Sequence, residues 1–223
     1  AKKYSVSANH VLIDIPMGEK VKVKNAKEAR HLKKKFESLG RNLGMNVKVI
    51  VTDGSRPIGN GIGPLLEADD VMAVLENSPH APQDLKEKAL SMAGILLHMT
   101  GKYRRGKAYA EAKEILESGR ALHRMNEIIR AQSKQKKIAL GEYRHLVKSP
   151  KSGKIMGIDN QVIAKCARIA GAPDDKGAGL YLAKKVKDKT VKGELLYTIY
   201  AENKFKLNLA KEFVRSDKGY DIR

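Results

Sequence analysis

The stretch that decides the fold is TDGSRPIGNGIGPLLEADD, residues 52–70. The largely apolar run Val47–Val51 leads into it, four glycines and two prolines crowd it, and a helical pattern begins near Pro64. A strand, a glycine-rich turn and a helix start together turn backbone N–H groups toward an anion or another ligand. Many α/β domains close such a corner with glycine, so this order indicates an α/β fold and leaves the ligand open.

The segments before this stretch predict alternating strands and helices. Residues 10–17 form an apolar run that is typical of a buried strand, with Pro16 near its end. Residues 26–43 carry apolar side chains at helical spacing, and Gly44 suits the end of that helix. The resulting β-α-β-α order predicts an open, mostly parallel sheet with helices.

The segments after it predict a helical region and then a second domain. Helices are expected over 85–99, 106–118 and 119–133, and a linker with a short strand near 143–147 follows. From Ser149 the pattern changes to short strands around one helix at 160–170. We therefore expect two domains, residues 1–147 and residues 148–223.

Composition sets the class of protein. The chain has 223 residues, no tryptophan and three phenylalanines, so its core must be aliphatic. It has no apolar run of 18 residues, and this makes a membrane-spanning helix unexpected. The start, Ala1-Lys2-Lys3-Tyr4, is neither an initiator methionine nor a signal peptide, and it reads as a chain entered midway.

The formal charge of +19 admits several explanations. Nucleic-acid binding is one of them, although the sequence has no RRM, KH or zinc-finger signature. Attraction of anionic substrates, or a lysine-rich surface of the thermophilic kind, explains the charge equally well. The charge therefore does not choose between an enzyme and a basic binding module.

Metal and nucleophile chemistry have little support. Cys166 is the only cysteine, which excludes a disulfide framework and fits a reducing cytoplasm; its helical setting favours a buried structural thiol over a nucleophile. The six histidines show no HxxxH or HExxH spacing, so a zinc site is not expected.

Three polar residues near the strands are weaker candidates. Asp14 stands inside an apolar strand and needs a partner there, and a structural, hydrogen-bonded role is favoured over that of a catalytic acid. For Asp53 a structural role is likewise favoured over a catalytic one. Arg56 could approach a phosphate. The glycines fit neither the dinucleotide fingerprint nor a P-loop, so a structural corner is favoured over a phosphate cradle.

The whole chain resembles one family. Three segments carry this resemblance: GNGIGPLLEADD at residues 59–70, AKKYSVSANHVLIDIPMG at 1–18 and GELLYTIYAE at 193–202. The chain is similar to the thymidine/pyrimidine nucleoside phosphorylases, and most like their archaeal AMP phosphorylase branch. The resemblance implies that residues 1–147 are the C-terminal part of the phosphorylase α/β domain. It also implies that residues 148–223 are a small α/β domain of the hammerhead type.

The resemblance implies a reaction and its partners. A nucleoside 5′-monophosphate and phosphate would give a free base and ribose 1,5-bisphosphate, with no organic cofactor. A cytoplasmic homo-oligomer without a membrane or a specific nucleic acid as partner is implied. The phosphate-binding residues of the family are expected outside this chain, so these 223 residues should be a fragment, inactive alone and without catalytic residues of their own.

The resemblance carries over one substrate-binding residue and one cation site. Lys2 matches the first lysine of the family's Ser-x-x-x-Lys-Lys segment, which contacts the nucleobase. Ile58 and Gly61, through their carbonyl groups, and Asp70, through its carboxylate, match the ligands of a monovalent or calcium ion. This chain has Asp where the family's pattern has Glu, and a simple helix-surface carboxylate is the favoured alternative for Asp70.

Two other functions stay open. Within the same reaction class, the protein could be a thymidine or pyrimidine nucleoside phosphorylase. From another class, it could be a basic nucleic-acid-binding module, whose affinity would fall steeply with salt.

Overall fold

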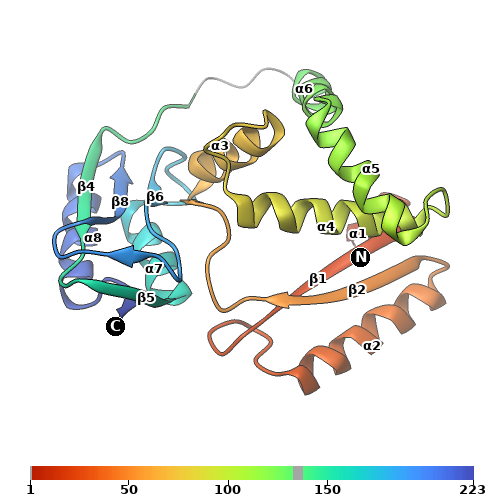
Figure 1. Cartoon of the computed structure of the whole chain (residues 1–223), viewed down its shortest axis with the longest axis horizontal. Helices are drawn as coiled ribbons and strands as arrows, with labels where there is room; N and C mark the ends of the chain where they lie inside the picture. Colours follow the sequence, from red (N-terminus) through yellow and green to blue (C-terminus); the bar gives the residue numbers. More distant parts are fainter. Residues whose placement is uncertain (1, 133–137) are drawn as a thin grey trace. The chain divides into compact units, whose positions relative to one another are not determined.

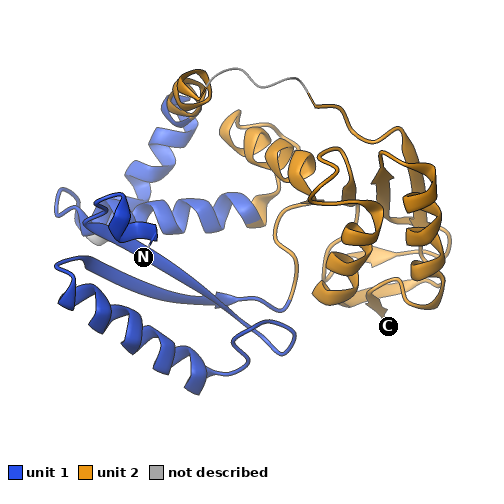
Figure 2. Ribbon diagram, turned by 180° about the vertical axis from the view of Figure 1, so that it is seen from behind, with its two compact units in different colours: residues 1–55, 85–121 blue, residues 56–84, 122–223 orange. Residues whose placement is uncertain are grey.

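A computed structural model describes residues 2–132 and 138–223. By their contacts the residues divide into two compact units, which Figure 2 colours separately. Unit 1 holds the residues up to 55 and residues 85–121, and unit 2 holds residues 56–84 and 122–223. The domain boundary expected at 147/148 from the change of sequence pattern stays a prediction.

Unit 1 is built on a β-α-β motif (Figure 1). Strands β1 (His10–Met17) and β2 (Asn46–Asp53) pair in parallel, from His10 opposite Asn46 to Met17 opposite Asp53. The helix between them, α2 (Ala26–Asn42), begins at an N-cap where the Asn25 side chain accepts the N–H of Glu28 at 3.0 Å. These bounds confirm the strand, the helix and the parallel pairing that the sequence predicts.

Alternation along the strands fixes which side of this sheet is covered. Val11, Ile15 and Val49 are at most 7% exposed, and they contribute to the core together with Ala29 of α2. Side chains alternate between the two faces of a strand, so Asp14 and Thr52 belong to the opposite face. That face carries the polar cluster described below.

The helical region has the expected order. It comprises α4 (Gln83–Met99), α5 (Arg105–Glu117) and α6 (Arg120–Ala131), close to the predicted bounds. Gly94 of α4 lies against the backbone of Tyr109 in α5, where a Cβ would stand 3.0 Å from the Tyr109 Cα, so glycine permits this close approach. Part of the expected linker after residue 133 lies outside the described residues. A four-residue helix, α1 (Lys2–Ser5), precedes β1.

Unit 2 is a mixed α/β unit with antiparallel sheets. Its four-stranded sheet has the order β3-β6-β8-β4, and its three-stranded sheet has the order β7-β5-β9. The first sheet comprises β3 (Gly61–Ile62), β6 (Gly179–Leu182), β8 (Leu195–Ala201) and β4 (Tyr143–Lys148), and the second comprises β7 (Lys189–Thr190), β5 (Gly153–Ile158) and β9 (Tyr220–Ile222).

Two helices complete the core of unit 2. Helix α7 (Asn160–Ala170) packs against α8 (Lys204–Ser216), and both bury apolar faces against the strands. Leu180, Leu196, Tyr197 and Ile199 are fully buried in this core. The chain is therefore an α/β protein, as expected, with parallel pairing in unit 1 and antiparallel pairing in unit 2.

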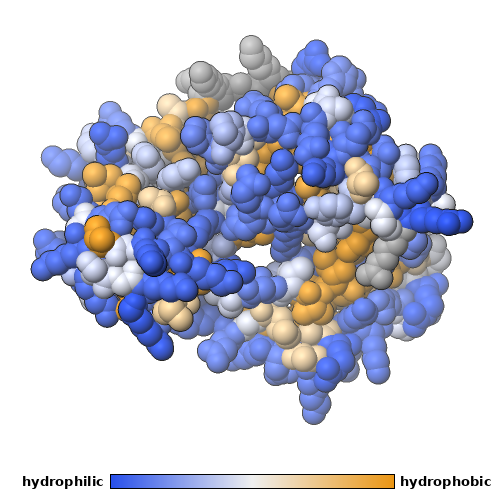
Figure 3. All heavy atoms as spheres, in the orientation of Figure 1, coloured by the Kyte–Doolittle hydropathy of each residue, from blue (hydrophilic) through white to orange (hydrophobic). Residues whose placement is uncertain are grey.

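The surface matches the composition. On the face that Figure 3 shows, hydrophilic residues cover most of the area, in keeping with 31% charged residues. Among the described residues, no helix combines the length and the apolar character needed to cross a membrane.

Candidate functional site

The glycine-rich loop is closed by its own acid. The Oδ2 atom of Asp70, in α3 (Pro64–Leu75), accepts the backbone N–H groups of Asn60 at 2.6 Å and Gly61 at 2.8 Å. Gly59 and Gly63 have φ angles of 73° and 126°, which other residues rarely adopt. The loop's N–H groups thus point at a carboxylate of the protein, and this makes the segment a structural corner.

The same loop is an edge strand of unit 2. Gly61 and Ile62 form β3 and pair with Tyr181 and Leu180 of β6. The N–H of Leu182 also donates to the carbonyl of Asn60 at 2.8 Å. The sequence did not reveal this strand, because its partner lies more than a hundred residues further along the chain.

The candidate cation ligands have distinct surroundings. Asp70 is 7% exposed, and its Oδ2 already accepts two N–H groups, so a cation there would have to be met by the other carboxylate oxygen. Ile58 is 41% exposed. Oxygen-only ligands fit a hard cation, but the role seen for Asp70 is closing the loop, and the cation stays a prediction.

The neighbouring acid, Asp69, is perturbed by this crowding. Burial raises the pKa of its carboxyl, and the negative charge of Asp70 raises it further. Among the described residues, no group of three histidine, cysteine or acidic side chains is arranged to hold a metal ion.

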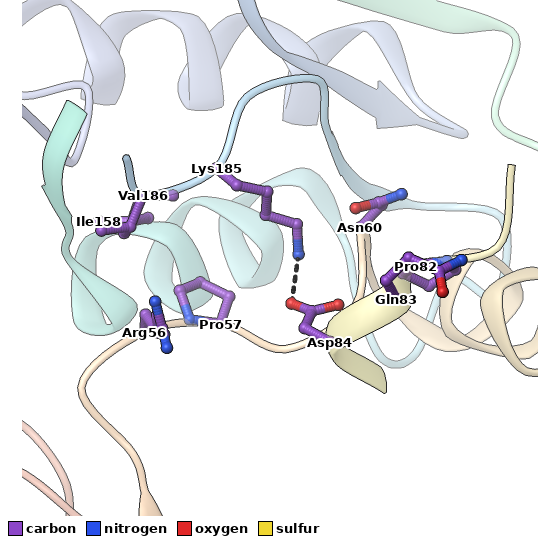
Figure 4. A pocket seen from close by; sticks show the side chains of 9 residues that line it. All are labelled: Arg56, Pro57, Asn60, Pro82, Gln83, Asp84, Ile158, Lys185 and Val186. Carbon is purple, nitrogen blue, oxygen red and sulfur yellow. Dashed lines mark hydrogen bonds and ion pairs between the residues drawn. The ribbon is translucent and has the colours of Figure 1, made fainter. Parts of the chain in front are cut away.

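A pocket of about 300 Å³ opens beside the loop in unit 2 (Figure 4). At its centre, the Lys185 ammonium lies 3.0 Å from Asp84 Oδ2 and also donates to the carbonyl oxygen of Gly59. Two prolines and two aliphatic side chains give it apolar walls. It is lined by Arg56, Pro57, Asn60, Pro82, Gln83, Asp84, Ile158, Lys185 and Val186.

Lys185 has the role of an internal cation in this pocket. Its ammonium joins the glycine-rich loop to the first turn of α4, where the negative charge of Asp84 also suits the helix dipole. Sequence reasoning missed both residues, since Lys185 is one of several lysines between 184 and 192 and nothing local marks it.

A second polar cluster lies on the β1–β2 sheet in unit 1. Asp14 Oδ2 is 2.5 Å from the Lys88 Nζ, and Asp14 Oδ1 accepts the Thr52 hydroxyl at 2.7 Å. Lys88 also donates to Thr52 Oγ1 at 3.3 Å. The cluster gives Asp14 the partner that its apolar strand requires, in keeping with the structural role favoured from the sequence, whereas Lys88 was not foreseen.

The remaining residues singled out in the sequence are an exposed lysine, a turn-forming acid and a buried thiol. Lys2 is exposed in α1, where its carbonyl accepts the Ser5 hydroxyl at 3.0 Å, and its role toward a nucleobase stays a prediction. Asp53 accepts the N–H and the hydroxyl of Ser55 at 2.9 and 2.6 Å, as a turn-forming acid does. Cys166 is fully buried, and burial raises the pKa of its thiol to about 12, which confirms a structural thiol.

Together these features define an α/β protein in which the recognisable polar candidates pair with one another. The loop amides of Asn60 and Gly61 donate to Asp70, Lys185 pairs with Asp84, and Lys88 pairs with Asp14.

The comparisons with known proteins give one domain match and several similar proteins. Residues 154–221 match the family described as the pyrimidine nucleoside phosphorylase C-terminal domain. The whole chain is 44% identical to a protein of Methylococcus capsulatus (strain Bath) and 47% identical to one of Rhodopseudomonas palustris (strain CGA009), both named "Putative thymidine phosphorylase". It covers 43% of the length of each.

A third relative carries another name. A protein of Methanococcus aeolicus named AMP phosphorylase is 43% identical over 227 residues, which include 100% of this chain and 45% of that protein. Over its whole length the chain is similar to proteins of the thymidine/pyrimidine nucleoside phosphorylase type, and it spans less than half the length of these relatives.

Proposed function

We propose that these residues are the C-terminal portion of an AMP phosphorylase. The observation that carries the proposal is the similarity of the entire chain to the Methanococcus aeolicus protein of that name, at 43% identity. The wording of the glycine-rich string, GNGIGPLLEADD, supports the same branch.

The proposed reaction is a phosphorolysis. Phosphate attacks C1′ of the nucleotide ribose, the bond from C1′ to the base breaks, and its electron pair leaves with the base, giving ribose 1,5-bisphosphate. The Lys2 ammonium donates to the base and stabilises the negative charge that develops on it. The phosphate-binding residues are proposed to lie outside this chain, so catalysis needs the longer protein and its homo-oligomer.

The test compares substrates in the full-length protein. With phosphate present, release of free base is measured from AMP, CMP, UMP and thymidine. Turnover of nucleotides, with AMP the best of them, is expected. Turnover of thymidine alone would instead favour the second candidate, a thymidine phosphorylase, which the names of the two bacterial relatives support.

Substitution of Lys2 tests the proposed role of this residue. The Lys2→Gln variant should lose about 10²–10³-fold in kcat, the range seen when one donor to a developing negative charge is removed. Lys3→Gln is the matched control, because it removes the same charge from the next exposed position of α1. Equal losses in the two variants would show that Lys2 has no special role.

A further inference from the structure

The outward face of the three-stranded sheet β7-β5-β9 in unit 2 is basic. Along these strands Ile155, Ile158, Thr190 and Ile222 are buried, with a register shift in β5 between Ile155 and Gly157, so the exposed positions beside them face outward. Those exposed positions carry Lys154, Met156, Lys189, Asp221 and Arg223. The face therefore has three cations and one acid.

The three cations form a row across neighbouring strands. Lys154 lies directly opposite Lys189 in the β5–β7 ladder. On its other side, the N–H of Lys154 donates to the carbonyl of Arg223 at 2.5 Å, and the N–H of Arg223 donates back at 2.9 Å. Opposite residues in antiparallel strands share a face with Cβ atoms about 5 Å apart, so Lys154 stands between two like charges.

A nearby acid neutralises positive charge at only one end of this row. Asp221 pairs with Arg223 at 3.1 Å. Across the part of the chain that the structure describes, neither Lys154 nor Lys189 has an ion-pair partner. Like charges directly opposite each other destabilise a sheet, and an unrelieved row of this kind suits a surface that meets negative charge from outside.

Three further lysines are exposed in the loops that adjoin these strands. Lys151, Lys187 and Lys192 are exposed at positions next to β5 and β7. The acid between them, Asp188, accepts the backbone N–H of Lys185 at 2.7 Å. The basic face, defined as Lys151, Lys154, Lys187, Lys189, Lys192 and Arg223, thus gathers six cations within one unit.

We propose that the basic face binds the phosphate backbone of double-stranded nucleic acid without reading its sequence. The charges match a polyphosphate, and a second copy of this chain that presented the same basic face to it would be repelled. The five outward side chains of the sheet include no aromatic ring to stack on unpaired bases, and Tyr220 points inward, stacked on Tyr197 at 5.7 Å. Lysines acting as point charges suit contacts with phosphates, which carry no sequence information.

The test measures binding of a fluorescently labelled 20-base-pair DNA duplex by anisotropy, with the full-length protein, between 50 and 200 mM salt. Contacts with three to five phosphates predict a slope of log K against log salt of about −3 to −5. The triple variant Lys154→Gln/Lys189→Gln/Arg223→Gln should reduce the slope by about 2–3 and keep the circular dichroism spectrum of the parent.

The matched control removes the same charge elsewhere. Lys27, Lys34 and Lys35 are exposed on α2, and their triple change to glutamine should leave most of the affinity and slope intact. Equal losses in both triple variants, absence of duplex binding at 50 mM salt, or tighter binding of polyglutamate or of anionic phosphatidylserine vesicles than of the duplex would each overturn the proposal. None of these readouts depends on phosphorolysis.

Discussion

At the residue scale, each unit contains an internal cluster built around a lysine ammonium. Asp14, Thr52 and Lys88 form one cluster in unit 1, and Asp84, Lys185 and the Gly59 carbonyl form another in unit 2. In each, a lysine ammonium links segments that are distant in sequence. Asp14 was recognisable in the sequence because it stands among apolar neighbours, whereas Asp84 was not singled out. Lys88 and Lys185 could not be recognised either, since one lysine among many has no local signature.

Replacing Lys88 tests the first cluster. The side chains of Lys88 and Asp14 are 27% and 16% exposed, so Lys88→Met leaves a mostly buried carboxylate without its cation. A fully buried pair would lose about 3–5 kcal/mol on such a change, and the remaining exposure here lowers the expected loss to about 1–2 kcal/mol. The free energy of unfolding in urea measures it.

The control for Lys88 is an exposed pair. Lys113 and Glu117 on α5 are 53% and 50% exposed at 3.8 Å, so Lys113→Met should change the stability by less than about 0.5 kcal/mol. A Lys88→Met variant no less stable than Lys113→Met would mean that the cluster contributes little.

At the element scale, the sequence predicts the segments with long, regular patterns. The β1–α2–β2 motif, the helices α4–α6, strand β4 and helix α7 all lie near their expected positions. The two-residue strands β3 and β7 exist only through pairing with distant partners, which no local pattern encodes. Helix α8 was overlooked, although Leu207, Ala210 and Val214 have helical spacing behind an Asn203 N-cap.

The loop corner gives the element-scale prediction. A Cβ at Gly61 would collide with the backbone carbonyl of Leu66 and stand 2.8 Å from the Leu66 Cβ. Gly61→Ala should therefore destabilise the protein by about 1–3 kcal/mol, as overpacking does. The melting temperature by calorimetry reports the change.

A helical glycine with free space serves as the control. Among the described residues, no heavy atom lies within 4 Å of the point that a Cβ at Gly106 in α5 would occupy. Gly106→Ala should therefore stabilise the protein by up to about 1 kcal/mol. If both substitutions raised the melting temperature, the close approach at Gly61 would not be a real constraint.

At the scale of the whole molecule, charge is the dominant property. A net charge of +19 over 223 residues opposes compaction through self-repulsion. The ion pairs seen among the described residues are mostly exposed, and such pairs contribute little. Screening by salt should therefore favour the folded state.

Salt dependence of stability tests this view. The Debye length falls from about 30 Å at 0.01 M to about 10 Å at 0.1 M salt, so the melting temperature should rise over that range. Changing Lys27, Lys34, Lys35 and Lys107, all exposed, to glutamate lowers the net charge by eight and should flatten the rise. A melting temperature that falls as salt is added would contradict the role of self-repulsion.

The division of the chain into units has a consequence for how the sequence can recombine in evolution. Unit 2 is assembled from residues 56–84 and 122–223, with the first segment supplying the edge strand β3. A gene crossover with one breakpoint between these segments would join a β3 corner from one parent to a β6 partner from the other. The glycine string and the later strands must therefore change together in evolution, because they form one structural unit from two separate segments of the sequence.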